Sequence, residues 1–126
     1  VRLLLNRRGD AALRARFARE RHLHAPALID AEVASAIRGL LLTTKPEVQI
    51  TATRAEDMLE DFADLPIVRY PMQPLQRRAL SLRHNFTAYD AFYVALAESL
   101  GMPLLTDDSK FAKAPTPPAP IEVWSA

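Results

Sequence analysis

The sequence predicts an α/β fold with a mostly parallel sheet, formed by a single domain. Short apolar segments of strand length alternate with longer segments of helical periodicity along the 126 residues, and this order is typical of parallel α/β proteins. Two independent cores are not expected at this length. Ligands of parallel α/β sheets bind beyond the carboxyl ends of the strands, where the following helices begin. Functional residues are therefore expected at that rim of the sheet.

Composition excludes several classes of protein. The chain has no cysteine, which rules out disulfide scaffolds, thiolate zinc sites and cysteine nucleophiles and is compatible with a cytoplasmic protein. The 16 basic and 15 acidic residues give a net charge of +1. This balance argues against a histone-like protein but permits a nucleic-acid ligand, because the distribution of charge matters more than its sum. No run approaches the roughly 18 consecutive apolar residues of a membrane span.

The first half of the chain predicts three helices and two short strands. Asp10 is suited to cap a helix that runs to about residue 20. A short strand follows within 21–27, and apolar residues at helical spacing predict a helix over 28–42. Thr53 and Glu56 form a capping-box pattern that starts a helix to about residue 64, before a strand at 67–70. Three side chains of this helix are expected to point inward: Met58, Leu59 and Phe62.

The second half predicts two helices and two strands. One helix runs to about Arg83. Thr87 and Asp90 cap the next helix, which ends at Gly101. The remaining segments are a strand, a polar turn, a proline-rich loop and a last strand, at 103–106, 107–109, 114–120 and 121–124.

Asp90 is the most informative residue, since it is the only charged residue between positions 88 and 97. A helix that is apolar on all sides is a buried helix, and an ionised carboxylate there is costly unless it is paired or binds a metal ion. The structural alternative is that Asp90, as the third residue of the helix, is stabilised by the positive end of the helix dipole.

Glu32 repeats this situation in the segment 25–37, where only Asp30 and Glu32 are charged. At about 100° per residue the two side chains point to nearly opposite sides of a helix. Asp30 is suited to the N-cap, which leaves Glu32 as the inward candidate. The alternative is that Glu32 is a surface acid of an amphipathic helix.

Asp107 and Asp108 directly follow the strand at 103–106. Aspartate is common in turns, but this place at a strand's carboxyl end puts the pair at the same rim as Glu32 and Asp90. Carboxylates brought together repel each other unless a cation lies between them. Oxygen ligands without histidine or cysteine favour Mg²⁺ or Mn²⁺, and such ions activate water for phosphodiester cleavage.

These acids lie in segments that resemble a known family. The segment TAYDAFYVALAESLGMPLLTDD, residues 87–108, resembles the signature of the PIN domain in VapC-type toxins of VapBC toxin–antitoxin systems. APALIDAEVASAIR, residues 25–38, is similar to the family's segment with its second acid. The resemblance implies a three-layer α/β sandwich, a metal-dependent endoribonuclease that cleaves RNA, a homodimer, and a cognate VapB-type antitoxin that blocks the groove.

The resemblance also implies a role for each matching residue. Glu32 corresponds to the second acid, Asp90 to the third and Asp108 to the fourth. Asp107 is an adjacent alternative to Asp108, and Thr106 is implied as a contact to the metal ion or its water.

One departure from the family pattern concerns the start of the chain. The family begins with a short apolar strand that ends in an aspartate just before a helix, whereas the first five residues here resemble the middle of that helix. The first acid and the central strand are therefore expected before Val1, and Asp10 does not replace them because it caps the next helix. A truncated sequence, a start site assigned too late, or a degenerate protein would each explain the difference.

Other residues carry weaker signals. Arginines crowd the first 21 residues, which suits phosphate contacts but is more often a solvated helix face; the same holds for Arg77, Arg78 and Arg83. Acidic residues dominate 47–64 and indicate an exposed face directed away from RNA. Asn85 is either a substrate contact or a helix C-cap. Tyr89 is expected in the core.

Two further functions remain compatible with the sequence. The first is another nuclease role in the same family, such as RNA maturation or DNA cleavage. The second is a non-catalytic PIN-like interaction module that only binds a partner. Metal-dependent cleavage of RNA separates the interaction module from the enzymes.

Overall fold

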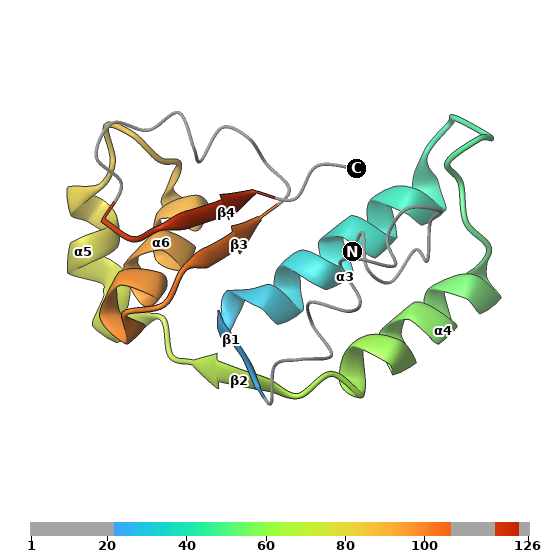
Figure 1. Ribbon diagram of the computed structural model, residues 1–126. Helices are drawn as coiled ribbons and strands as arrows, with labels where there is room; N and C mark the ends of the chain where they lie inside the picture. The colour runs from blue at the N-terminus through green and yellow to red at the C-terminus, as the bar shows by residue number, and fades with distance from the viewer. Residues whose placement is uncertain (1–21, 107–117, 124–126) are drawn as a thin grey trace. The chain divides into compact units, whose positions relative to one another are not determined.

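The structure, a computed structural model, describes residues 22–106 and 118–123. The described residues form two compact units, each of which is considered by itself. The first unit comprises residues 22–24 and 29–68, and the second comprises the remaining described residues. Strands and helices follow one another in the α/β order that the sequence predicts (Figure 1). The helix expected at 10–20 lies outside the described residues.

The first unit is built on two helices, α3 (Leu28–Leu42) and α4 (Ala52–Ala63). α3 has the bounds that the sequence predicts. Its inward residues recur four positions apart, so they form one stripe along the helix. The buried core of the unit draws on both helices: Val33, Ile37, Ala55 and Met58.

α4 begins two residues before the position that the capping-box pattern indicates. Thr51 is the N-cap, and its Oγ1 accepts a hydrogen bond from the Arg54 N–H at 3.1 Å. The prediction that Thr53 starts this helix is therefore wrong. Met58 is fully buried as predicted, but Leu59 is 41% exposed, because it lies about 100° further around the helix.

The first strand pair consists of β1 (Leu23–Pro26) and β2 (Ile67–Tyr70). Backbone hydrogen bonds of 2.8 Å flank the pair, from Leu23 N to the Pro66 carbonyl and from Ala27 N to the Tyr70 carbonyl. The two bonds advance by four residues along both strands in the same direction. This is the pattern of parallel strands, as the sequence predicts.

The second strand pair consists of β3 (Leu104–Thr106) and β4 (Ile121–Val123). The two strands are parallel, with Leu104 opposite Ile121 and Thr106 opposite Val123. In the part of the chain that the structure describes, the two pairs are separate two-stranded sheets.

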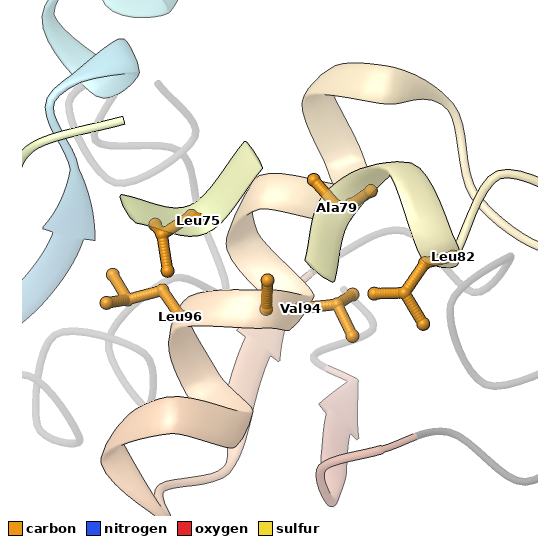
Figure 2. Packing of buried hydrophobic residues seen from close by; sticks show 7 residues of the cluster. Leu75, Ala79, Leu82, Val94 and Leu96 are labelled. Carbon is orange, nitrogen blue, oxygen red and sulfur yellow. The ribbon is translucent and has the colours of Figure 1, made fainter. Parts of the chain in front are cut away.

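The second unit packs η1 (Gln73–Leu75) and α5 (Gln76–Ser81) against α6 (Ala88–Leu100). Figure 2 shows side chains of the η1–α5 segment gathered against Val94 and Leu96 of α6. α6 is buried at four consecutive positions, 94–97, which confirms that its apolar sequence belongs to a buried helix. α5 ends at Ser81 rather than at Arg83, so the predicted helix is two residues too long.

Both ends of α6 lie where the sequence predicts. Thr87 is the N-cap, with its Oγ1 accepting the Asp90 N–H at 3.4 Å. Gly101 adopts the left-handed conformation at φ 63°. The Met102 N–H reaches the Ala97 carbonyl at 3.0 Å and the Gly101 N–H reaches the Glu98 carbonyl at 3.1 Å, which together form a Schellman motif. Within the described residues, no helix has the length and apolarity needed to cross a membrane.

Candidate functional site

Asp90 is the third residue of α6 and is half-buried. The backbone of Asp90, through its N–H, makes the N-cap bond with Thr87. The described residues supply no hydrogen bond or ion pair to the Asp90 carboxylate. In the part of the chain that the structure describes, the carboxylate at the start of this buried helix therefore has no hydrogen-bond or ion-pair partner.

Glu32 lies in the second turn of α3, and Asp30 lies in the first. Asp30 is not the predicted N-cap, because α3 begins two residues earlier, at Leu28. The relative burial of the two acids nevertheless follows the prediction. Glu32 is half-buried and Asp30 is exposed, as their nearly opposite directions on the helix require.

Thr106 is the last residue of β3 and is half-buried. The turn residues Asp107 and Asp108 follow it directly in the sequence but lie outside the described residues. The strand that leads to them is well defined, since its parallel partner β4 fixes the register opposite Thr106. The predicted place of Thr106 at a strand's carboxyl end is therefore confirmed.

Asp90 and Thr106 belong to the same unit. α6 contacts β3, and the chain reverses at Gly101 between them (Figure 1). β3 therefore runs back along α6, with its carboxyl end directed toward the end of the helix that carries Asp90. Glu32 lies in the other unit. Among the described residues no group of three or more histidine or acidic side chains gathers as a metal site.

Two residues near Asp90 are exposed. Asn85 lies in the loop between α5 and α6, where its N–H donates to the Leu82 carbonyl at 3.1 Å. Tyr89 is 62% exposed, so the prediction that it belongs to the core is wrong. The sequence could not show this, because α6 is apolar on all sides and offers no polar stripe that marks its solvent face.

An ion pair between α5 and α6 is absent from the sequence-based predictions. Arg78 donates from Nε to Glu98 Oε1 at 2.7 Å and from Nη2 to Glu98 Oε2 at 2.8 Å. These hydrogen bonds lower the pKa of Glu98 and raise that of Arg78. Arg78 therefore has a structural partner, whereas Arg77 and Arg83 are exposed, as a solvated helix face predicts.

The described residues of the two units differ in charge. The described part of the first unit carries eight acidic and three basic side chains, and that of the second carries three acidic and four basic ones. The predicted acidic face is confirmed as exposed, with six acids: Glu47, Glu56, Asp57, Glu60, Asp61 and Asp64. Phosphate groups are therefore disfavoured at this acidic face.

Comparison with known proteins identifies the family. A family model described as the PIN domain matches residues 1–117. The chain belongs to the PIN-domain family. Ribonuclease VapC12 of Mycobacterium tuberculosis is 38% identical to this PIN domain over 123 residues, which are 98% of the chain and 92% of the relative. Ribonuclease VapC1 of the same species is 44% identical over 101 residues, or 79% of the chain and 73% of the relative.

A third relative is also named as a VapC ribonuclease. Ribonuclease VapC9 of Mycobacterium tuberculosis is 37% identical over 114 residues, which cover 90% of this PIN domain and 86% of the relative. The resemblance read from residues 25–38 and 87–108 is thus confirmed over nearly the whole chain.

The candidate acids carry donor atoms that suit a hard divalent cation. Asp90 and Glu32 are half-buried carboxylates, and the described residues leave the Asp90 oxygens without a partner. Carboxylate oxygens are the ligands that Mg²⁺ and Mn²⁺ prefer. The chain has no cysteine that would favour a softer metal ion.

Proposed function

We propose that this PIN domain is a Mg²⁺- or Mn²⁺-dependent endoribonuclease of the VapC type, the toxin of a type II toxin–antitoxin pair. The observation that carries the proposal is the half-buried Asp90 at the start of the apolar helix α6, in a chain 38% identical to a protein named Ribonuclease VapC12. An acid in this place is costly to bury and is explained by a cation that it holds.

The proposed metal ligands are Glu32, Asp90 and Asp108, with Asp107 as the alternative to Asp108. The proposed fold is the three-layer α/β sandwich with a mostly parallel sheet that the PIN domain implies. When bound between such ligands, Mg²⁺ or Mn²⁺ lowers the pKa of water and stabilises charge on the oxygens of a phosphodiester.

The chain's own residues position these groups. Thr87 fixes the first turn of α6 through the Asp90 N–H, so the carboxylate is held by a rigid helix instead of a loop. Thr106 orients a water molecule at the carboxyl end of β3, and Asn85 contacts the substrate from the loop before α6. The protein supplies no nucleophile of its own in this reaction.

The proposed partners follow from the VapC type. RNA is the substrate, a VapB-type antitoxin blocks the site, and the protein forms a homodimer in the cytoplasm. The acidic face within 47–64 is directed away from the RNA, since its exposed acids repel phosphate.

Cleavage of RNA by the full-length protein tests the proposal. We expect cleavage with Mg²⁺ or Mn²⁺ and none with EDTA, and Asp90→Asn should abolish it. Asp57→Asn, which neutralises an exposed acid of α4, is the matched control and should cleave as wild type does. If wild type cleaves no RNA with either ion, or if Asp90→Asn cleaves equally fast, the chain is a non-catalytic interaction module.

Stability without metal separates a catalytic Asp90 from a structural one. An acid in the first turn of a helix stabilises it by about 0.3–1 kcal/mol through the helix dipole, but repulsion within a cluster of acids opposes this. We therefore expect Asp90→Asn to leave the metal-free protein as stable as wild type or more stable in urea denaturation. A loss well above 1 kcal/mol would show that Asp90 serves the fold.

A further inference from the structure

The aromatic ring of Tyr89 is exposed directly beside the proposed metal ligand Asp90. Tyr89 is the second residue of α6 and is 62% exposed. The other aromatic residues of this helix, Phe92 and Tyr93, are half-buried. Burial of a tyrosine ring is strongly favourable, and the described residues provide no hydrogen-bond partner for the Tyr89 hydroxyl. Among the described residues, the Tyr89 side chain therefore adds little to the packing of the second unit.

The loop that precedes α6, and so Tyr89, is polar and carries a cation. The loop before α6 exposes three polar side chains: Arg83, His84 and Asn85. Arg83 Nη1 donates to the Leu80 carbonyl at 3.3 Å, which holds its guanidinium at the carboxyl end of α5. Exposed aromatic rings together with arginines and other polar side chains are typical of surfaces that bind single-stranded nucleic acid.

We propose that Tyr89 stacks on a nucleobase of the single-stranded RNA whose phosphodiester is held at Asp90. This inference rests on the proposed ribonuclease function and adds a substrate contact to it. Cα atoms of adjacent residues lie about 3.8 Å apart, so the ring and the carboxylate leave the same turn of α6 in directions about 100° apart, and a strand of several nucleotides can contact both. Proteins bind unpaired bases by stacking them on aromatic rings. The contact positions the strand and tolerates different bases, because every base has a π face.

Binding measured without cleavage tests the stacking contact. All variants are made in the Asp90→Asn background, and fluorescence anisotropy follows two probes: a short labelled oligoadenylate and an abasic oligoribonucleotide of the same length. We expect Tyr89→Ala to weaken binding of oligoadenylate by about 5- to 100-fold and to leave binding of the abasic probe unchanged. Tyr89→Phe keeps the ring and should bind both probes as the parent does.

Met102→Ala is the matched control. Met102 is also exposed, at 37%, but it follows the carboxyl end of α6, whose 13 residues span about 20 Å. Loss of an exposed apolar side chain there should not change binding of either probe.

Any of four outcomes would overturn the inference. Tyr89→Ala could weaken both probes equally or neither, the parent could bind neither probe, or Tyr89→Ala could convert a dimer to a monomer in light scattering, which would assign the ring to a subunit contact. Cleavage by the wild-type protein is measured separately. If wild type cleaves RNA but base binding does not depend on Tyr89, only the stacking contact is refuted. If base binding depends on Tyr89 but wild type does not cleave RNA, only the ribonuclease function is refuted.

Discussion

Arg78 and Glu98 join α5 to α6 by two parallel hydrogen bonds of 2.7 and 2.8 Å. This paired geometry uses the planar fork of the guanidinium, which a lysine cannot reproduce. Glu98 lies near the carboxyl end of α6, whereas Asp90 lies in its first turn. It therefore serves the packing of the second unit, and its contribution can be measured apart from catalysis.

The pH dependence of stability should report this ion pair. The hydrogen bonds from Arg78 lower the pKa of Glu98 in the folded protein below its ordinary value of 4.5. The stabilisation is therefore fully present above that ordinary value and is lost as the pH falls through the lowered folded value. We expect the thermal midpoint of wild type to fall more steeply than that of Glu98→Gln as the pH is lowered below 4.5.

Glu56→Gln is the control for this measurement, because it removes an exposed carboxylate from α4. It should follow the wild-type curve. Curves for wild type and Glu98→Gln that stay parallel down to strongly acidic pH would contradict the assigned role of the pair.

The two described glycines should respond to alanine with opposite signs. Gly101 has φ 63°, and an L-residue pays roughly 1–2 kcal/mol there, so Gly101→Ala should destabilise the protein by about that amount. Gly39 lies within α3, where an added Cβ meets no atom within 4 Å, and Gly39→Ala should stabilise by about 0.4–1 kcal/mol. Urea denaturation measures both. Equal signs would show that one of the two backbone conformations is misassigned.

Neighbouring residues of α4 should differ sharply in their contribution to the core. Met58 is fully buried, and Met58→Ala should cost about 2–5 kcal/mol. Leu59 is 41% exposed, and Leu59→Ala should cost about 0.5 kcal/mol or less. Comparable losses in chemical denaturation would indicate that both side chains are buried, as the sequence pattern alone suggests.

Substitution of the two acids near the start of α3 should affect RNA cleavage differently. Glu32→Gln removes a proposed metal ligand, and we expect it to slow RNA cleavage by at least about 10-fold, the least that loss of a group around a metal ion commonly costs. Asp30→Asn changes an exposed acid of the same helix and should cleave as wild type does. If Asp30→Asn is the inactive variant, the assignment of the second acid is reversed.

Local signals in the sequence predict much of this fold. The ends of α6 follow from Thr87 and Gly101, whose side chain and backbone freedom act within one turn of the helix. The start of α4 does not follow in the same way, because Thr51 and Thr53 both suit an N-cap. The choice between them depends on tertiary structure: the Ile50 N–H donates to the Leu40 carbonyl at 3.2 Å, which fixes where the chain enters the helix.

Local sequence signals do not predict contacts between residues that are distant in the sequence. Arg78 and Glu98 are 20 residues apart, and nothing in their sequence neighbourhood indicates that they meet. The exposure of Tyr89 likewise depends on how α6 packs against α5. The candidate acids were found because their charge is unusual in apolar helices, whereas their assembly into one metal site stays a prediction.

The cap of α6 also explains why residue 90 is an aspartate. In a full capping box, a glutamate at this third position reaches back to the backbone N–H of the N-cap residue. Asp90 is one methylene shorter and leaves that N–H alone, while Thr87 accepts the Asp90 N–H. Lengthening this acid by one carbon would therefore tie its carboxylate into the helix start. We expect Asp90→Glu to be more stable but less active than wild type, because its carboxylate is already hydrogen-bonded within the helix.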